Sequence, residues 1–350
     1  MKHQTTRYGE IPFYKIGTFG NTADAFISKK LFLEYKTKYS FPKKGDILIS
    51  ASGTIGRAVI YDGKPAYFQD SNIVWIDNDE TLVKNDFLFY AYSNVKWNTE
   101  HTTILRLYND NFKNTLIPLP PLNEQIAIAN ILSDVDHYLY SLDALILKKE
   151  GVKKALSFEL LSQRKRLKGF NQAWQRVRLG DIAEIVKGQQ INKISLNNTD
   201  KYPVINGGID FLGYTNKFNV SKNTIAISEG GTCGYVRFMT SNFWSGGHNY
   251  SLQKISNKVN NLCLYHILKS YEKDIMKLGV GSGLKNIQLK ALKDFEIPLP
   301  PLNEQSAIAN ILSTLDNEIT SLKNKKRQFE NIKKALNHDL MSTKIRVLEK

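Results

Sequence analysis

One stretch of sequence, Ile117 to Gln125, occurs a second time without change at Ile297 to Gln305, a shift of 297 − 117 = 180 residues. The likeness extends past it, because Ala127 to Ser133 recurs at the same shift. In a chain of 350 residues this period is too long for a solenoid repeat, so it indicates two copies of a whole domain. We expect a pseudo-twofold relation between the copies, which suits a ligand with two sites at a fixed spacing.

Each repeated stretch carries three prolines and is followed by a long helical pattern. Pro118, Pro120 and Pro121 favour extended backbone before the pattern, and Pro121 suits a first helical turn. Apolar residues then recur at alternating spacings of four and three, which is an a/d heptad seam. The seam residues are Ile128, Leu132, Val135, Leu139, Leu142 and Ile146 in the first copy and Ile308, Leu312, Leu315, Ile319 and Leu322 in the second.

This seam predicts one helix from near Pro121 to about Lys165 and another from near Pro301 to about Met341. At ~1.5 Å per residue each is roughly 60 Å long. We expect the two helices to pair as an antiparallel coiled coil; the alternative is that each packs on its own domain. Gly169, which follows a run of basic residues, is predicted to be the C-cap of the first helix.

The regions before the two proline steps have a different character. They contain short alternating runs of β-branched and aromatic residues separated by Gly, Asn, Asp and Ser, which is typical of a mainly β domain. Strands are expected at 46–50, 58–61, 72–76, 223–228 and 249–252, and helices at 87–93 and 262–277. The predicted fold is α+β, with two β-rich domains, 1–116 and 174–296, each followed by a proline step and a long helix, 117–168 and 297–350.

The two β-rich regions retain a trace of common origin. The pattern Ile-Ser-x-x-Gly-Thr-x-Gly occurs at 49–56 and again at 227–234, and its glycines predict a turn between two strands. Asn72 aligns with Asn249 at a similar shift. The opening of the second region, 174–188, has no counterpart that we find in the first half.

The chain carries 48 basic and 33 acidic residues, a formal net charge of +15. A surplus of this size favours a polyanion as partner, first nucleic acid and second an anionic membrane, although a basic soluble surface is a simpler explanation. The sequence has no apolar run long enough to span a membrane and no signal-peptide pattern at its start, which indicates a cytoplasmic protein.

Catalytic motifs are missing from the sequence. There is no GxxxxGK[ST] phosphate loop, no GxGxxG fingerprint and no HExxH pair, and the six histidines show no metal-ligand spacing. What remains is a set of basic and amide side chains interleaved with aromatic residues, of the types that contact phosphates and base edges. The predicted DNA-contacting residues are Arg57, Lys64, Tyr67, Asn72, Arg106, Lys187, Lys193, Lys217, Arg237, His248, Asn249 and Lys285.

Two diverged domains that each end in Ile-Pro-Leu-Pro-Pro-Leu-Asn-Glu-Gln before a heptad helix resemble the DNA-specificity (S) subunit of type I restriction–modification enzymes. The resemblance covers essentially the whole chain. Trp174, the run Leu179 to Ile182, and Lys187 with Gly188 resemble the opening of a target-recognition domain of this family. The segments 9–13 and 45–50 resemble its later strands.

The resemblance implies a non-catalytic subunit in which each β-rich domain reads one half of a bipartite DNA target. The helices would set the spacing and bind two methyltransferase subunits, and two restriction subunits would join them. S-adenosylmethionine, ATP and Mg would belong to those partners, and the complex would be an adenine-specific methyltransferase and ATP-dependent endonuclease. The chain itself would hold no metal or cofactor.

Other functions remain open: a truncated or inactive specificity subunit, a stand-alone nucleic-acid enzyme, or a scaffold. The missing opening of the first domain has three explanations. The true start lies upstream, or the subunit is naturally truncated, or the tail after Met341 fills the gap.

Overall fold

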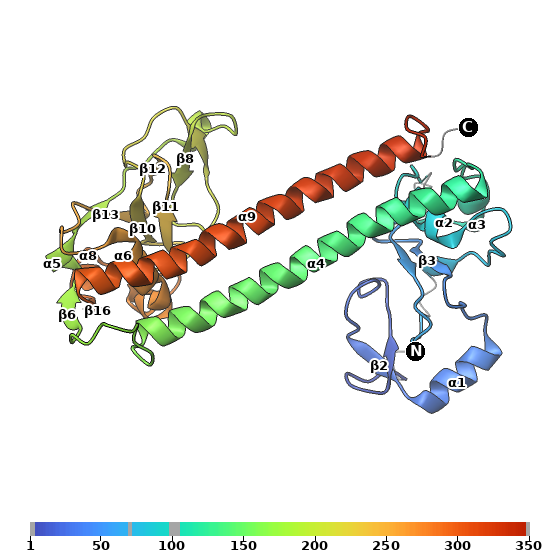
Figure 1. Cartoon of the computed structure of the whole chain (residues 1–350), viewed down its shortest axis with the longest axis horizontal. Coiled ribbons are helices and arrows are strands. Elements are labelled where there is room, and N and C mark those ends of the chain that lie inside the picture. Colours follow the sequence, from blue (N-terminus) through green and yellow to red (C-terminus); the bar gives the residue numbers. More distant parts are fainter. Residues whose placement is uncertain (1–3, 69–71, 98–105, 348–350) are drawn as a thin grey trace. The chain divides into compact units, whose positions relative to one another are not determined.

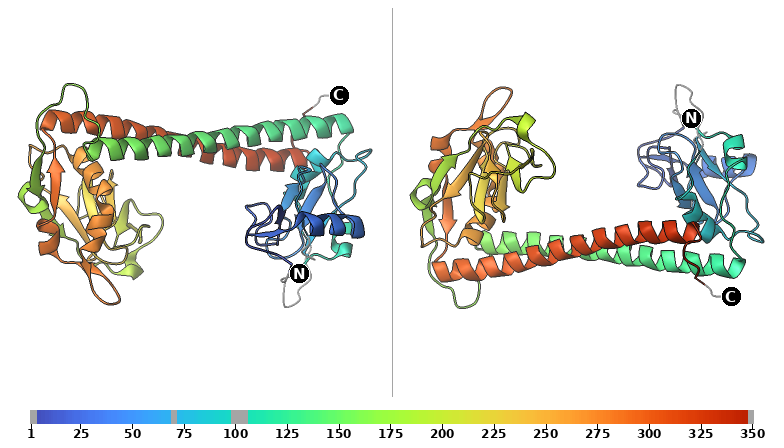
Figure 2. Two further views of the ribbon diagram at one scale, coloured as in Figure 1. Left: turned by 90° about the horizontal axis from the view of Figure 1, so that it is seen from below. Right: turned by 90° about the horizontal axis from the view of Figure 1, so that it is seen from above.

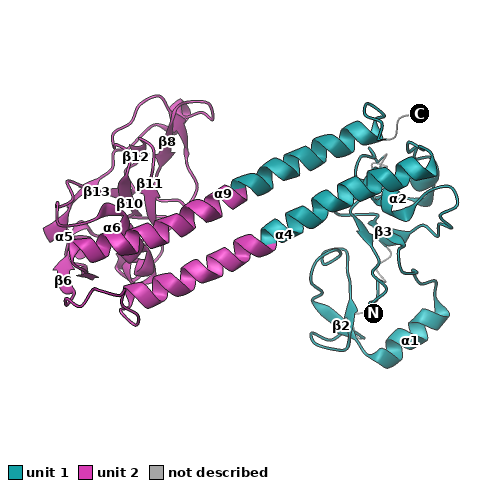
Figure 3. Cartoon of the chain, viewed as in Figure 1, with its two compact units in different colours: residues 1–143, 324–350 teal, residues 144–323 magenta. Residues whose placement is uncertain are grey.

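The computed structural model describes residues 4–68, 72–97 and 106–347, and these divide into two compact units (Figures 1 and 3). Unit 1 comprises Met1–Asp143 and Asn324–Lys350, and unit 2 comprises Ala144–Lys323. Two 40-residue helices, α4 (Leu122–Leu161) and α9 (Leu302–Met341), contribute one half to each unit and are drawn as unbroken ribbons in Figure 2.

Unit 1 is built from short strands and three short helices in addition to its halves of α4 and α9. Its central sheet has the strand order β4-β3-β5, all antiparallel, and a separate hairpin pairs β1 with β2. Its elements are β1 (Ile11–Phe13), β2 (Ala25–Ile27), α1 (Lys29–Lys38), β3 (Ile47–Ser50), β4 (Ala58–Ile60), β5 (Ile73–Trp75), α2 (Asn85–Tyr92) and α3 (Asn109–Lys113).

Unit 2 has the larger β structure, with a four-stranded antiparallel sheet in the order β11-β10-β13-β7 and a three-stranded sheet in the order β12-β8-β9. Two-stranded pairs join β14 to β15 and β16 to β6. Its elements are β6 (Gln175–Arg178), α5 (Leu179–Ile182), β7 (Glu184–Lys187), η1 (Lys193–Ser195), β8 (Tyr202–Ile205), β9 (Gly213–Thr215), β10 (Thr224–Ser228), β11 (Val236–Met239), β12 (Trp244–Ser245), β13 (Asn249–Gln253), α6 (Asn261–Ser270), α7 (Glu272–Lys277), β14 (Gly279–Val280), β15 (Asn286–Ile287), α8 (Leu289–Lys293) and β16 (Glu296–Leu299).

Apolar burial ties each β-rich region to its half of the helix pair. In unit 2 one continuous core joins strands and α6 to Leu312 of α9. In unit 1 Phe87 of α2 packs with Leu132 of α4 and Leu340 of α9. Hence the predicted packing alternatives coexist, because the same helices bury one side against a domain and another against each other.

All the predicted seam residues are buried or half-buried. Within each unit, ion pairs between the helices run in opposite sequence directions, so the two halves are antiparallel. Unit 1 pairs Asp143 with Lys326 and Asp136 with Lys333, at 2.7 and 2.5 Å. Unit 2 contains the pair equivalent to the latter, between Lys153 and Asp316, since both partners are shifted by 180 residues.

Three local predictions need correction. Helix α4 ends at Leu161 rather than near Lys165, because Gln163 turns the chain with a positive φ of 60°. Gly169 is therefore not the C-cap, although its own φ is 93°. The helix expected at 262–277 is broken at Tyr271 into α6 and α7.

Candidate nucleic-acid interface and the repeated latch

The repeated stretch forms a latch whose glutamine joins each long helix to its β-rich region. Gln305 is 1% exposed and donates through Nε2 to the carbonyls of Pro300 and Lys258 at 2.7 and 3.1 Å. Its Oε1 accepts from the backbone N–H of Asn260, the N-cap of α6, at 2.7 Å. The side chain thus uses both donor hydrogens and its acceptor.

Gln125 makes the same three bonds in unit 1. Its Nε2 donates to the carbonyls of Pro120 and Leu82 at 2.9 and 3.0 Å, and its Oε1 accepts from the backbone N–H of Lys84 at 2.8 Å. Lys84 is the N-cap of α2, as Asn260 is of α6. The repeated sequence is therefore structural, and it fixes where each helix leaves its domain.

The glutamate of the repeat binds an arginine that lies beyond the end of the other long helix. Glu304 is 1% exposed and receives both Nε and Nη2 of Arg166 at 2.8 Å, while Trp174 Nε1 donates to it at 3.0 Å. In unit 1 Glu124 receives Arg346 in the same two-pronged way at 2.6 Å. The hydrogen bonds from Arg346 lower the pKa of Glu124, although burial opposes this.

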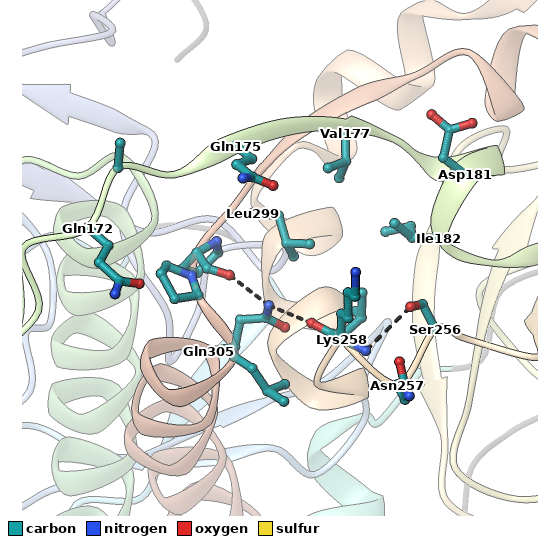
Figure 4. A pocket seen from close by; sticks show the side chains of 15 residues that line it. Gln172, Gln175, Val177, Asp181, Ile182, Ser256, Asn257, Lys258, Leu299 and Gln305 are labelled. Carbon is teal, nitrogen blue, oxygen red and sulfur yellow. Dashed lines mark hydrogen bonds between the residues drawn. The ribbon is translucent and has the colours of Figure 1, made fainter.

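A groove of about 860 Å³ opens beside the unit 2 latch (Figure 4). One wall is the segment that carries Gln175, Val177 and Ile182, and the other carries Leu299 and the Lys258 loop. The hydrogen bond from Gln305 to the Lys258 carbonyl lies at its base in Figure 4.

The richest polar cluster of unit 2 lies where β10 ends and β13 begins. Glu229 follows β10, with only 12% of its side chain exposed, and its Oε1 is 2.7 Å from Lys187 Nζ. The hydroxyl of Tyr250 is 3.3 Å from the same oxygen, and burial, aided by the Glu229 charge, raises the pKa of Tyr250 to about 12. His248 Nδ1 is 3.8 Å from Glu229 Oε2. One carboxylate therefore organises a cation, an imidazole and a phenol.

Amide side chains surround this cluster. Asn206 Oδ1 accepts from the backbone N–H of His248 at 3.0 Å. The neighbouring glycines permit close contact, since a Cβ on Gly230 would lie 2.3 Å from Asn286 Oδ1, and one on Gly247 would lie 2.5 Å from Gln190 Nε2. This edge of unit 2 therefore presents cationic, imidazole and amide groups of the kinds that contact bases and phosphates.

The predicted contact residues of unit 2 fall into two groups. Lys187, Lys193, Lys217, His248 and Lys285 are exposed. Arg237 is half-buried, and its guanidinium donates to the carbonyls of Gly208 and Ile209 and lies over the rings of Phe211 and Tyr235. Asn249 is 2% exposed. These last two therefore support the loops, and the structure gives them no free surface for a ligand.

The corresponding edge of unit 1 lies at the end of β3. Arg106 forms an isolated bridge with Ser52, and its guanidinium lies 5.8 Å from the ring centre of Tyr108. The Asn72 carbonyl accepts from Ala51 N–H at 2.6 Å. The described part of unit 1 thus brings Asn72 and Arg106 together at this edge.

The other three predicted residues of unit 1 are not brought to this cluster alike. Lys64 has a side chain that is 83% exposed and an ion pair to Asp62. Arg57 Nη1 donates to the Phe19 carbonyl at 3.1 Å. Tyr67 is 3% exposed in an aromatic core, where burial raises its pKa to about 12, so it is a core residue.

The predicted turn glycines occupy equivalent positions in the two units. Gly53 and Gly56 have φ of 68° and 78°, and Gly231 and Gly234 have φ of 68° and 83°. The alignment of Asn72 with Asn249 is wrong by one residue. The Asn72 carbonyl accepts from Ala51 as the His248 carbonyl accepts from Glu229, so Asn72 and His248 correspond.

Comparison with known proteins agrees with this duplicated architecture. The family model of the type I restriction modification DNA specificity domain matches residues 1–149 and 171–331. The chain belongs to the type I restriction–modification specificity subunit family. The described residues contain no helix long and apolar enough to cross a membrane, and no group of three His, Cys, Asp or Glu side chains placed to hold a metal.

Individual relatives and a solved structure are consistent with the family. A protein of Methanocaldococcus jannaschii, provisionally named the MjaX specificity subunit of a type I restriction enzyme, is 30% identical over 87% of this chain and 79% of its own length. A provisionally named specificity subunit of Haemophilus influenzae is 65% identical, but the match covers 38% of this chain and 34% of that protein. The crystal structure of a type I S subunit from M. genitalium has the same fold, with a TM-score of 0.71 at 21% identity, covering 97% of this chain and 91% of that chain.

Proposed function

We propose that this chain is the DNA-reading subunit of a type I restriction–modification complex and that each unit reads one half of a bipartite target. The observation that carries the proposal is the equivalence of two polar strand ends, at Glu229 in unit 2 and at Ser52 in unit 1, which lie on the same framework but bear different side chains. A shared framework with different side chains is what two readers of different sequences require. The net charge of +15 favours binding to a duplex.

In unit 2 we assign the readout to the cluster around Glu229. Lys187 and His248 offer donors, and Asn286 offers the paired donor and acceptor that match an adenine edge. Glu229 holds Lys187 in place, because an ion pair with a largely buried carboxylate restricts a long side chain. Lys193, Lys217 and Lys285, which are exposed, are assigned to phosphates.

In unit 1 the corresponding groups are Asn72 and Arg106, with Lys64 as an exposed cation. Arginine can take both acceptors of a guanine edge, and asparagine can take an adenine edge. Because Tyr67, Arg237 and Asn249 serve the core or the loops, the proposed interface excludes them.

The long helices are assigned to spacing and to partners. On α4, within unit 2, Leu147 and Phe158 have exposed fractions of 72% and 54% and lie eleven positions apart, on one side of a helix. An apolar stripe of this kind suits a protein partner. We assign that partner as a methyltransferase subunit, with two such subunits and two restriction subunits in the assembly.

Catalysis is assigned to those partners, with S-adenosylmethionine, ATP and Mg bound there. The assembled complex would then be an adenine-specific DNA methyltransferase and an ATP-dependent endonuclease. This chain would act in the cytoplasm as its non-catalytic subunit.

A second candidate is an inactive specificity subunit, and one observation favours it. Unit 1 has no described counterpart of the segment Trp174–Lys187, which completes the sheet of unit 2. A first domain without this segment would read DNA poorly.

A domain exchange tests the proposal. Residues 174–296 are replaced by the same region of another family member, and the methylated motif is determined with the methyltransferase present. The proposal requires one half-site to change while the other half-site and the gap stay the same. A change in both half-sites, or in neither, would refute the two-reader assignment. Cleavage of DNA by the purified chain with Mg²⁺ alone would instead support a stand-alone enzyme.

A further inference from the structure

Unit 1 has two open edges where unit 2 is closed by one segment. In unit 2, β6 pairs with β16, with Ile297 opposite Val177, and β7 pairs with β13, with Ser251 opposite Val186. Both strands belong to Trp174–Lys187, with α5 between them. A single strand–turn–strand segment therefore covers two separate edges.

The first open edge is Leu116–Leu119, which corresponds to β16 at the shift of 180 residues. No described residue forms a strand beside it. Ile117 is half-buried, whereas its counterpart Ile297 is fully buried. Leu116 and Leu119 have exposed fractions of 94% and 50%. These are apolar side chains on an extended backbone that carries free pairing groups.

The second open edge is β5, which pairs with β3 on one side and, within the described residues, with no strand on the other. In the register that equates Asn72 with His248, Ile76 corresponds to Leu252. Ile76 is 40% exposed, whereas Leu252, beneath β7, is 1% exposed. The edge that β7 covers in unit 2 is therefore uncovered here.

A third contact points to the same missing segment. In unit 2 Trp174 lies over Arg166, with the guanidinium carbon 5.9 Å from the ring centre, and donates to Glu304. In unit 1 the equivalent pair of Glu124 and Arg346 is formed, but 52% of the Arg346 side chain is exposed, against 28% for Arg166. An aromatic side chain on Arg346 would complete the arrangement.

We propose that unit 1 is a strand acceptor, which takes up from a separate polypeptide a segment of the same design as Trp174–Lys187. The donor pairs first with Leu116–Leu119 and then with Ile73–Trp75, and its aromatic residue lies on Arg346. Its apolar anchors follow the pattern of Leu179, Ile182 and Ile185, which are buried in unit 2.

The tail of the chain does not fill this role. Ser342 to Val347 form no strand with Leu116–Leu119. The tail instead repeats the turn that follows α4, since Thr343 has a φ of 58° and Gln163 a φ of 60°. Strand addition to an open edge is a known mode of peptide binding, in which backbone hydrogen bonds give affinity and pockets for alternate side chains give specificity.

The test uses the intact chain and a synthetic peptide with the sequence of residues 172–188. Hydrogen exchange is followed at Ile117, Leu119 and Ile73–Trp75, and binding is measured by the anisotropy of a labelled peptide. The control peptide carries Leu179→Asp and Ile182→Asp. We expect saturable 1:1 binding and exchange that slows about tenfold or more at both edges, with neither effect from the control. Arg346→Ala in the protein should weaken binding of the native peptide.

Weak affinity of this particular sequence is addressed by a second variant, in which residues 171–188 are appended after Lys350 so that the segment reaches the acceptor at high effective concentration. Protection of both edges in the extended chain supports the proposal. Unchanged exchange at both edges, with the peptide and with the extension, overturns it. A dimer of the unmodified chain whose edges are already protected also overturns it, because a second copy would then be the occupant.

Discussion

The glutamine latch leads to a quantitative prediction for Gln305→Leu. Leucine keeps most of the side-chain volume but removes three hydrogen bonds, to Pro300, Lys258 and Asn260. At about 1 kcal/mol for each bond, the loss is about 3 kcal/mol. It is not smaller, because Gln305 is 1% exposed and water cannot replace the bonds without opening the site.

Hydrogen exchange of α6 measures this loss, since Asn260 is the N-cap of that helix. A change of about 3 kcal/mol in local opening corresponds to roughly a hundredfold faster exchange. Gln125→Leu should accelerate exchange of α2 in the same way and leave α6 unaffected. Gln328→Leu, on the exposed surface of α9, is the matched control and should stay within ~0.5 kcal/mol of the parent. Equal exchange of α6 in Gln305→Leu and Gln328→Leu would show that the latch does not hold the helix.

Three further predictions concern binding, pH and spacing. Lys285→Ala should weaken DNA binding about equally for all sequences and lower the slope of log K against log salt by about one, whereas Lys254→Ala, at the far end of β13, should leave the slope unchanged in the same titration. Burial lowers the pKa of His266 to about 4 from 6.5, so the unfolded state binds the extra proton between these values, and the stability of unit 2 should fall as pH drops from about 6.5 to about 4; urea titrations of His266→Leu should show a smaller fall, and an identical pH profile would contradict this. One heptad inserted after Ala144 and another after Asn324 should lengthen the gap in the methylated motif by about three base pairs, and an unchanged gap would refute the spacing role.

Much of the framework was predictable from local pattern. The strands expected at 46–50, 58–61, 72–76, 223–228 and 249–252 correspond to β3, β4, β5, β10 and β13, because alternating apolar residues between turn residues identify strands directly. The prolines marked the start of α4, which begins at Leu122. Its end was missed, because a positive φ at Gln163 has no glycine to signal it.

The candidate site was harder to predict because its organising residue carries no repeated signal. Glu229 corresponds to Ala51 at the shift of 178 residues, so comparison of the two halves does not reveal it. Composition also cannot separate exposed from buried polar residues. Arg237 and Tyr67 have suitable chemistry for DNA, yet the first supports a loop and the second fills a core. Only tertiary contacts make that distinction.

The most direct test of the central claim is a methylome of a methylation-free host that carries this chain with its methyltransferase subunit. The account predicts one asymmetric motif with two specified half-sites and a gap of fixed length. Methylation of a single continuous motif, or of half-sites separated by gaps of varying length, would contradict two readers held at a set spacing.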